Sequence, residues 1–165
     1  MSTFQQWLWE REACPEAREW VEALPPEEAW DICEEPDWLL WYANEVTPQV
    51  TVPEALDLLH RFSILIASRA EKAAGMRAET ARRFASTSYL TVTIMERIYN
   101  SHRPAPISLR EVMDHLHTVA HSFVKAMDDM NHPESGLIKR LMVNEINTTI
   151  RFPGVPEGVL EGEES

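Results

Sequence analysis

The sequence predicts an all-α protein, with a cluster of short N-terminal helices packed on an antiparallel bundle of about four longer helices. Apolar residues recur every three or four positions along most of the chain, which is the spacing of one helix face. There are five glycines in 165 residues, too few for a β-rich fold with many tight turns. The chain is 44% apolar and long enough to bury one core, so residues 1–150 are expected to form a single domain.

The first 46 residues predict four short helices. Ser2 or Thr3 can cap the first one, and prolines mark the start of the other three, where a missing N–H costs nothing. Helices this short are not stable alone, so tertiary packing must hold them. All six tryptophans of the chain lie before residue 42 and supply the large apolar faces for that packing. The expected ranges are 3–9, 15–24, 26–33 and 36–46.

Residues 51–150 predict the longer bundle helices. The range 54–74 is apolar around most of its circumference and precedes Gly75, a typical helix end. The range 77–100 also reads as a helix, because a lone strand over its Ser- and Thr-rich middle would have nothing to pair with. Ser108 and Glu111 form a capping box that opens the helix 108–130. A last helix covers 133–150, and the acidic, Gly- and Pro-containing residues 151–165 are expected to be a disordered tail.

Charge is distributed unevenly along the chain. The net charge is −12, and the first 50 residues hold twelve acidic residues against two basic ones. Residues 51–103 hold eight basic residues against five acidic ones. A strongly negative field repels phosphate, so direct nucleic-acid binding is disfavoured and a basic protein partner is favoured. The alternative is that the acidic third docks on the basic middle of the same chain.

The sequence gives no sign of export or membrane insertion. It contains no apolar run of eighteen residues, and charged residues stand where a signal peptide would need an apolar segment. A cytoplasmic location is therefore expected. In a reducing compartment Cys14 and Cys33 are expected to be free and buried.

The predicted partner-binding surface lies in the acidic N-terminal third. Carboxylates there can meet a basic surface, and an exposed tryptophan can anchor the contact. The competing interpretation of the tryptophans is core packing, because tryptophan at helical spacing is usually buried. The residues assigned to this surface are Trp7, Trp9, Glu27, Glu28, Asp31, Glu34, Glu35 and Asp37.

A candidate metal cluster lies on the predicted helix 108–130. Asp114, His117 and His121 are spaced by three and four residues, so their side chains share one face and could bind zinc with a ligand from another helix. Thr118 stands where a metalloprotease would need a glutamate. The alternative is a polar face in which Asp114 bonds His117 and His121 faces solvent.

A second constellation points to magnesium. Glu54 with Asp57, and Glu111 with Asp114, are paired acids on two predicted bundle helices, as in all-helical nucleotide pyrophosphohydrolases. Arg61 follows Asp57 by four residues, so a surface ion pair competes with this interpretation. No catalytic residue is assigned, because the chain lacks G-x-S-x-G, P-loop and G-x-G-x-x-G motifs.

The segment 13–41 carries a resemblance. It reads Ala-Cys-Pro-Glu-Ala-x-x-Trp, then Glu-Ala-Trp-x-x-Cys, then Asp-Trp-Leu-Leu-Trp. This string resembles an N-terminal helical motif of small phage and bacterial proteins, some of them similar to putative immunity proteins that neutralise toxins. Pro36 stands where those relatives would have glycine, and the resemblance does not extend beyond Val46. It implies a phage or mobile-element setting and a binding role.

Two functional hypotheses follow. The favoured one is a non-enzymatic acidic interaction protein that inhibits or adapts a basic host protein, such as a nucleic-acid-binding defence factor or a toxin, without cofactor. The alternative is a zinc- or magnesium-dependent helical hydrolase. A homodimer is also open, because Leu137, Leu141 and Met142 of the last helix could face either the core or a second copy.

Overall fold

The computed structural model describes residues 2–46, 50–70, 93–94, 97, 108–129, 131 and 133–160. Every regular element in these residues is a helix, which confirms the predicted all-α class. The predicted helix 77–100 and its neighbour Gly75 lie outside them, apart from Thr93, Ile94 and Arg97, which are helical. The helices are α1 (Thr3–Glu10), α2 (Pro15–Val21), α3 (Pro26–Ile32), α4 (Pro36–Val46), α5 (Val52–Ala70), α7 (Leu109–Asp129) and α8 (Ser135–Thr149).

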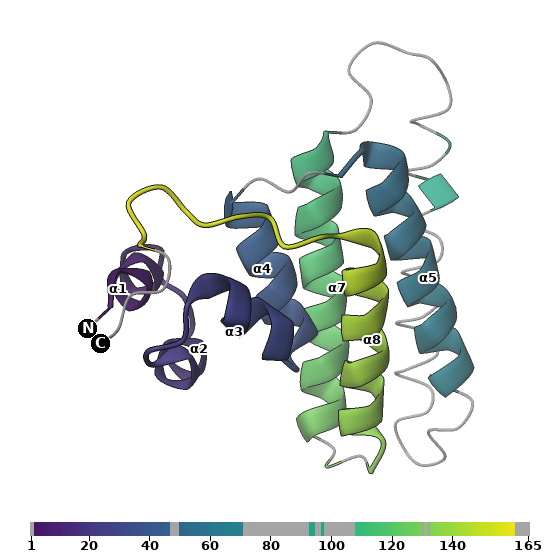
Figure 1. Ribbon diagram of the computed structural model, residues 1–165. Coiled ribbons are helices and arrows are strands. Elements are labelled where there is room, and N and C mark those ends of the chain that lie inside the picture. Colours follow the sequence, from purple (N-terminus) through teal and green to yellow (C-terminus); the bar gives the residue numbers. More distant parts are fainter. Residues whose placement is uncertain are drawn as a thin grey trace.

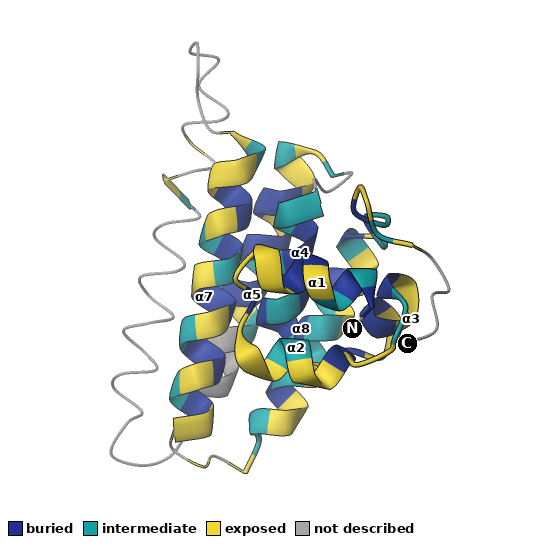
Figure 2. Cartoon of the chain, turned by 90° about the vertical axis from the view of Figure 1, so that its left-hand side faces the viewer, coloured by how far each residue is buried: buried dark blue, intermediate teal, exposed yellow. Residues whose placement is uncertain are grey.

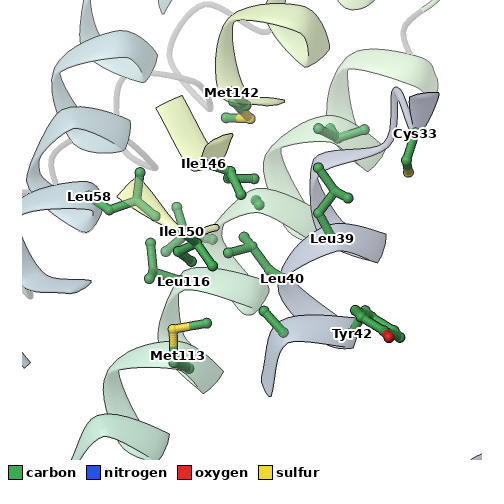
Figure 3. Packing of buried hydrophobic residues seen from close by; sticks show 14 of the residues in the cluster. Cys33, Leu39, Leu40, Tyr42, Leu58, Met113, Leu116, Met142, Ile146 and Ile150 are labelled. Atoms are coloured by element: carbon green, nitrogen blue, oxygen red, sulfur yellow. The ribbon is translucent and has the colours of Figure 1, made fainter. Parts of the chain in front are cut away.

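The bundle consists of α4, α5, α7 and α8 among the described helices (Figure 1). Both α4 and α5 pack on α7 and α8, and α7 and α8 run antiparallel. Helix α4 was expected in the N-terminal cluster, but Leu40 and Ala43 are fully buried and place it inside the bundle. Met142 is fully buried as well, so it belongs to the core and not to a dimer surface (Figure 3).

Aromatic side chains join the smaller helices α1 and α3 to α4. Tyr42 on α4 is at the centre, with ring centroids 5.9 Å from Phe4, 5.8 Å from Trp7 and 6.0 Å from Trp30. Such edge-to-face and tilted pairs stabilise beyond the area that they bury. The cluster therefore holds helices that are too short to persist alone.

Local caps set several helix starts. The Ser2 hydroxyl accepts a hydrogen bond from the Gln5 amide at 3.1 Å, and the Ser108 hydroxyl accepts one from the Glu111 amide at 3.2 Å. Both caps were predicted. The start of α5 has a complete capping box, which the sequence analysis did not assign. There Thr51 N donates to Glu54 Oε1 at 3.1 Å, and Glu54 N lies 3.3 Å from the Thr51 hydroxyl.

The prediction of a disordered tail is wrong for residues 151–160. This segment runs from the end of α8 past α4 towards α1 (Figure 1). The Tyr42 hydroxyl donates to the Gly154 carbonyl at 2.6 Å, and the Leu160 amide donates to the Thr3 hydroxyl at 2.9 Å. The Phe152 ring stacks on Tyr42 with centroids 6.2 Å apart. Residues 161–165 lie outside the described part of the chain.

In the part of the chain that the structure describes, no helix combines the length and apolarity needed to cross a membrane.

Candidate functional site

A cavity of about 590 Å³ lies between the N-terminal helices and α7. Figure 2 views the molecule from the side on which α1 and α2 lie over the bundle. The lining is mainly apolar and aromatic, and its charged and imidazole side chains come from residues 12–16 and 35–37 and from α7 and α8. The apolar and aromatic lining residues are Phe4, Leu8, Ala13, Ala17, Trp20, Val21, Pro26, Ala29, Trp30, Trp38, Leu39, Trp41 and Tyr42.

Two indole rings form an aromatic pair in this lining. Trp20 of α2 and Trp38 of α4 have ring centroids 5.8 Å apart. Trp20 remains 37% exposed, which is unusual for so large an apolar side chain. The pair therefore offers aromatic surface to anything that enters the cavity.

Asp37 is the buried charged group of the cavity. It lies in the first turn of α4, where the helix dipole favours a negative charge. The residue is 8% exposed, and its Oδ2 lies 2.8 Å from Nδ1 of His121 on α7. A carboxylate oxygen accepts, so in this contact the ring N–H of His121 donates. The other oxygen, Oδ1, is buried and has no hydrogen-bond partner among the described residues.

The candidate metal cluster does not form in the way predicted. His117 stacks on His121 with centroids 5.8 Å apart, but the Asp114 carboxylate accepts a hydrogen bond from Asn44 at 2.6 Å and not from His117. Within the described ranges, no three His, Cys, Asp or Glu side chains converge on a point where an ion could be held. Burial lowers the pKa of His117, so this imidazole is neutral at neutral pH. His121 therefore pairs with Asp37, and His117 stacks on His121.

A cation bridges the polar side of the cavity. Lys139 of α8 lies 3.0 Å from Glu35 and 3.0 Å from Asp128, and its side chain is 18% exposed. Desolvation raises the pKa of Glu35 above its ordinary value, although the hydrogen bond and the charge of Lys139 oppose that rise. The sequence analysis assigned Glu35 to the partner-binding surface. In the structure Glu35 is instead bound to Lys139 within the fold.

The described lining of the cavity includes no activated nucleophile. Burial raises the pKa of the Cys33 thiol to about 12 and also raises that of Cys14. The structure exposes Cys14 at the N-terminus of α2, so the expectation that both cysteines are buried is wrong for this one. Serine and threonine do not occur among the described lining residues. The arrangement suits binding better than covalent catalysis.

The predicted partner surface is divided by the structure. Glu27, Glu28, Asp31 and Glu34 are exposed, and in the described residues none of them forms an ion pair. Asp37 is buried against His121 and is not a surface residue.

The two predicted tryptophan anchors also differ. Trp7 is 7% exposed, because it packs on Tyr42 and Trp41, so its assignment as a surface anchor is wrong. Trp9 is 56% exposed, and the Arg18 guanidinium lies 3.7 Å from its ring centroid. Trp9 thus remains on the surface, with one face covered by a cation of the same chain.

The paired acids proposed for magnesium are occupied locally. Glu54 caps α5 through Thr51, and Asp57 forms an ion pair with Arg61, which also contacts Glu145 at 3.0 Å. This is the surface ion pair that competed with the magnesium interpretation. With Asp114 held by Asn44, three of the four acids are committed to other contacts.

The sequence analysis assigned Asp37 to the partner-binding surface, and His117 and His121 to a candidate metal cluster. It did not find the contact between α4 and α7 that joins Asp37 to His121, 84 positions apart. Trp20 and Trp38 were noted as apolar faces and not as cavity walls. Comparison with protein-family models, curated proteins and solved structures finds no match, so the interpretation of this site depends on its geometry.

Proposed function

We propose that the protein is a non-enzymatic binding protein whose acidic N-terminal region docks on a basic protein partner. The resemblance of residues 13–41 supports a phage or mobile-element inhibitor or adaptor, with a nucleic-acid-binding defence factor or a toxin as the target. A cytoplasmic location is part of the same proposal, in keeping with two free cysteines.

The acidic face of α3 carries this proposal. This face consists of Glu27, Glu28 and Asp31 of α3 and of Glu34 just after the helix, with the apolar Ile32 among them. Ile32 is 52% exposed. An exposed isoleucine among carboxylates that form no ion pair within the described residues suits a partner surface with lysines or arginines around an apolar centre.

The negative charge of this face would mainly raise the rate at which a basic partner associates. A chain of net charge −12 steers a basic partner towards it, and the carboxylates then select against acidic surfaces. Screening is strong beyond about 8 Å at physiological ionic strength, so the effect must weaken as salt is added.

The test compares two charge reversals of equal size. One variant carries Glu27→Lys, Glu28→Lys and Asp31→Lys on the α3 face. The matched control carries Glu10→Lys, Glu19→Lys and Glu157→Lys, three exposed acids elsewhere. Both change the net charge equally, so only a docking role for α3 separates them.

Affinity capture from the native host would identify a partner, and calorimetry with the purified partner would measure binding. We expect the α3 variant to bind at least about tenfold more weakly than the control, with affinity falling as salt rises. Equal affinities for the two variants, or binding that ignores salt, would refute the proposal.

A further inference from the structure

We propose that the cavity beside Asp37 is a binding site for a small organic cation, a protonated amine carried on an apolar body. This site is distinct from the α3 face and does not depend on a protein partner.

The size and lining of the cavity favour a free small molecule. A volume of about 590 Å³ exceeds that of any single amino-acid side chain and lies within the range of small-molecule sites. The walls are largely aromatic and aliphatic, and charged side chains, Asp37 among them, are a minority of the lining, as expected where an apolar body is bound and one end is held by charge.

The charge of the lining favours a cation. Five carboxylates occur among the described lining residues, and Lys139, the one lysine or arginine among those residues, is already bound to two of them. Glu12 and Glu16 have no cationic partner in the described residues, so the cavity stays negative even when His121 carries a charge against Asp37. The five are Glu12, Glu16, Glu35, Asp37 and Asp128.

Asp37 supplies the specific anchor. Its Oδ2 is satisfied by His121, whereas its Oδ1 is buried with no donor in the described part of the chain. Such an oxygen is costly to leave unpaired, and a carboxylate turns easily about χ2 to present either oxygen to a ligand. An ammonium group would satisfy it and compensate its charge together.

The indole pair gives a second reason for a cation. Trp20 and Trp38 line the same cavity as Asp37, and indole faces attract positive charge more strongly than other aromatic side chains. A neutral hydrogen-bond donor would gain the bond to Asp37 without this attraction, and an anion would be repelled by the lining. The expected order of affinity is therefore amine, alcohol, carboxylate.

The experiment uses three probes of one shape: 4-phenylbutylammonium, 4-phenylbutanol and 4-phenylbutanoate. Calorimetry and tryptophan fluorescence would measure their binding to the full-length protein. We expect the ammonium to bind, the alcohol to bind more weakly and the carboxylate not to bind at millimolar concentration.

The decisive variant is Asp37→Asn. It keeps an acceptor for His121 but replaces the free oxygen by an NH₂ group, which opposes a cation. We expect about tenfold or greater loss of ammonium affinity and a much smaller loss for the alcohol, whose hydroxyl oxygen can accept a hydrogen bond from the new NH₂ group. Asp31→Asn on the exposed face of α3 is the matched control, with the same charge change outside the cavity.

A second variant does not alter Asp37. Ala17→Phe places a ring at a position that lines the cavity and should abolish binding of both ammonium and alcohol, with near-UV circular dichroism confirming the fold. Equal affinity for the three probes, no binding by the ammonium, or identical behaviour of the Asp37 and Asp31 variants would each overturn the proposal. The Asp37→Asn protein should still capture a partner through α3, so the two proposals can fail separately.

Discussion

Replacing Tyr42 by phenylalanine isolates one hydrogen bond that fastens the C-terminal segment to the N-terminal helices. The ring of Tyr42, 7% exposed, keeps its contacts with Phe4, Trp7, Trp30 and Phe152. Only the hydroxyl that donates to the Gly154 carbonyl at 2.6 Å is lost. Burial raises the pKa of this hydroxyl far above its ordinary value, so it remains a donor throughout the neutral and mildly alkaline range.

The loss of unfolding free energy expected for Tyr42→Phe depends on how far the Gly154 carbonyl, which accepts the bond, is buried. A neutral hydrogen bond contributes about 1 kcal/mol net, and the half-buried Gly154 carbonyl regains water only in part, so we expect a loss of about 1 to 1.5 kcal/mol. For a chain of this size that corresponds to a fall in Tm of about 2 to 5 °C.

Urea unfolding followed by tryptophan fluorescence would measure this loss, because all six tryptophans lie in the part of the chain that Tyr42 holds together. Thr148→Val is the control, since it removes an exposed hydroxyl that bonds only to its own helix at Asn144, 2.8 Å away. Hydrogen exchange should show earlier opening of residues 151–160 in the Tyr42 variant. A Tyr42→Phe protein as stable as wild type, with unchanged exchange, would show that the hydroxyl is dispensable and that the other contacts of this segment, the Phe152 ring on residue 42 and the Leu160 amide on Thr3, are sufficient to hold it.

Two further predictions test the core and its pH response. Leu40→Ala removes a fully buried side chain between α4, α7 and α8, and we expect it to cost about 2 to 5 kcal/mol in urea unfolding. Leu160→Ala, at 60% exposure, should change stability by less than about 0.5 kcal/mol, and a similar effect of the two would contradict the packing described. The second concerns Cys33, whose pKa is raised from 9.0 to about 12 by burial, so the folded state keeps its proton where the unfolded state loses it. Stability from this thiol is full below pH 9 and is lost as pH rises towards 12, so between pH 7 and 10 wild type should lose about 1 kcal/mol more than Cys33→Ala. If wild type and Cys33→Ala lost the same unfolding free energy between pH 7 and pH 10, the result would argue against a buried, protonated thiol.

Helix identity and position could be predicted because the signals are local. Pro15, Pro26 and Pro36 begin α2, α3 and α4, and Ser108 caps α7, as the sequence analysis stated. A proline or a capping hydroxyl acts on its own helix turn, so its effect can be read without knowing what lies nearby.

Contacts between distant segments could not be predicted. Trp7 and Trp9 are two residues apart on α1, yet one is buried and the other exposed, because only Trp7 faces Tyr42. The composition of the tail predicted disorder, but Phe152 packs on the rings of Trp30 on α3 and Tyr42 on α4.

The sequence by itself determined an acidic, helical chain and most of its helix starts, since propensity, capping and periodicity act over a few residues. Tertiary structure alone decided that Asp37 would meet His121 beside an aromatic cavity, while the carboxylates of α3 stayed in solvent. Periodicity specifies which side chains share a face of a helix, and the packing of α4 on α7 specifies what that face meets.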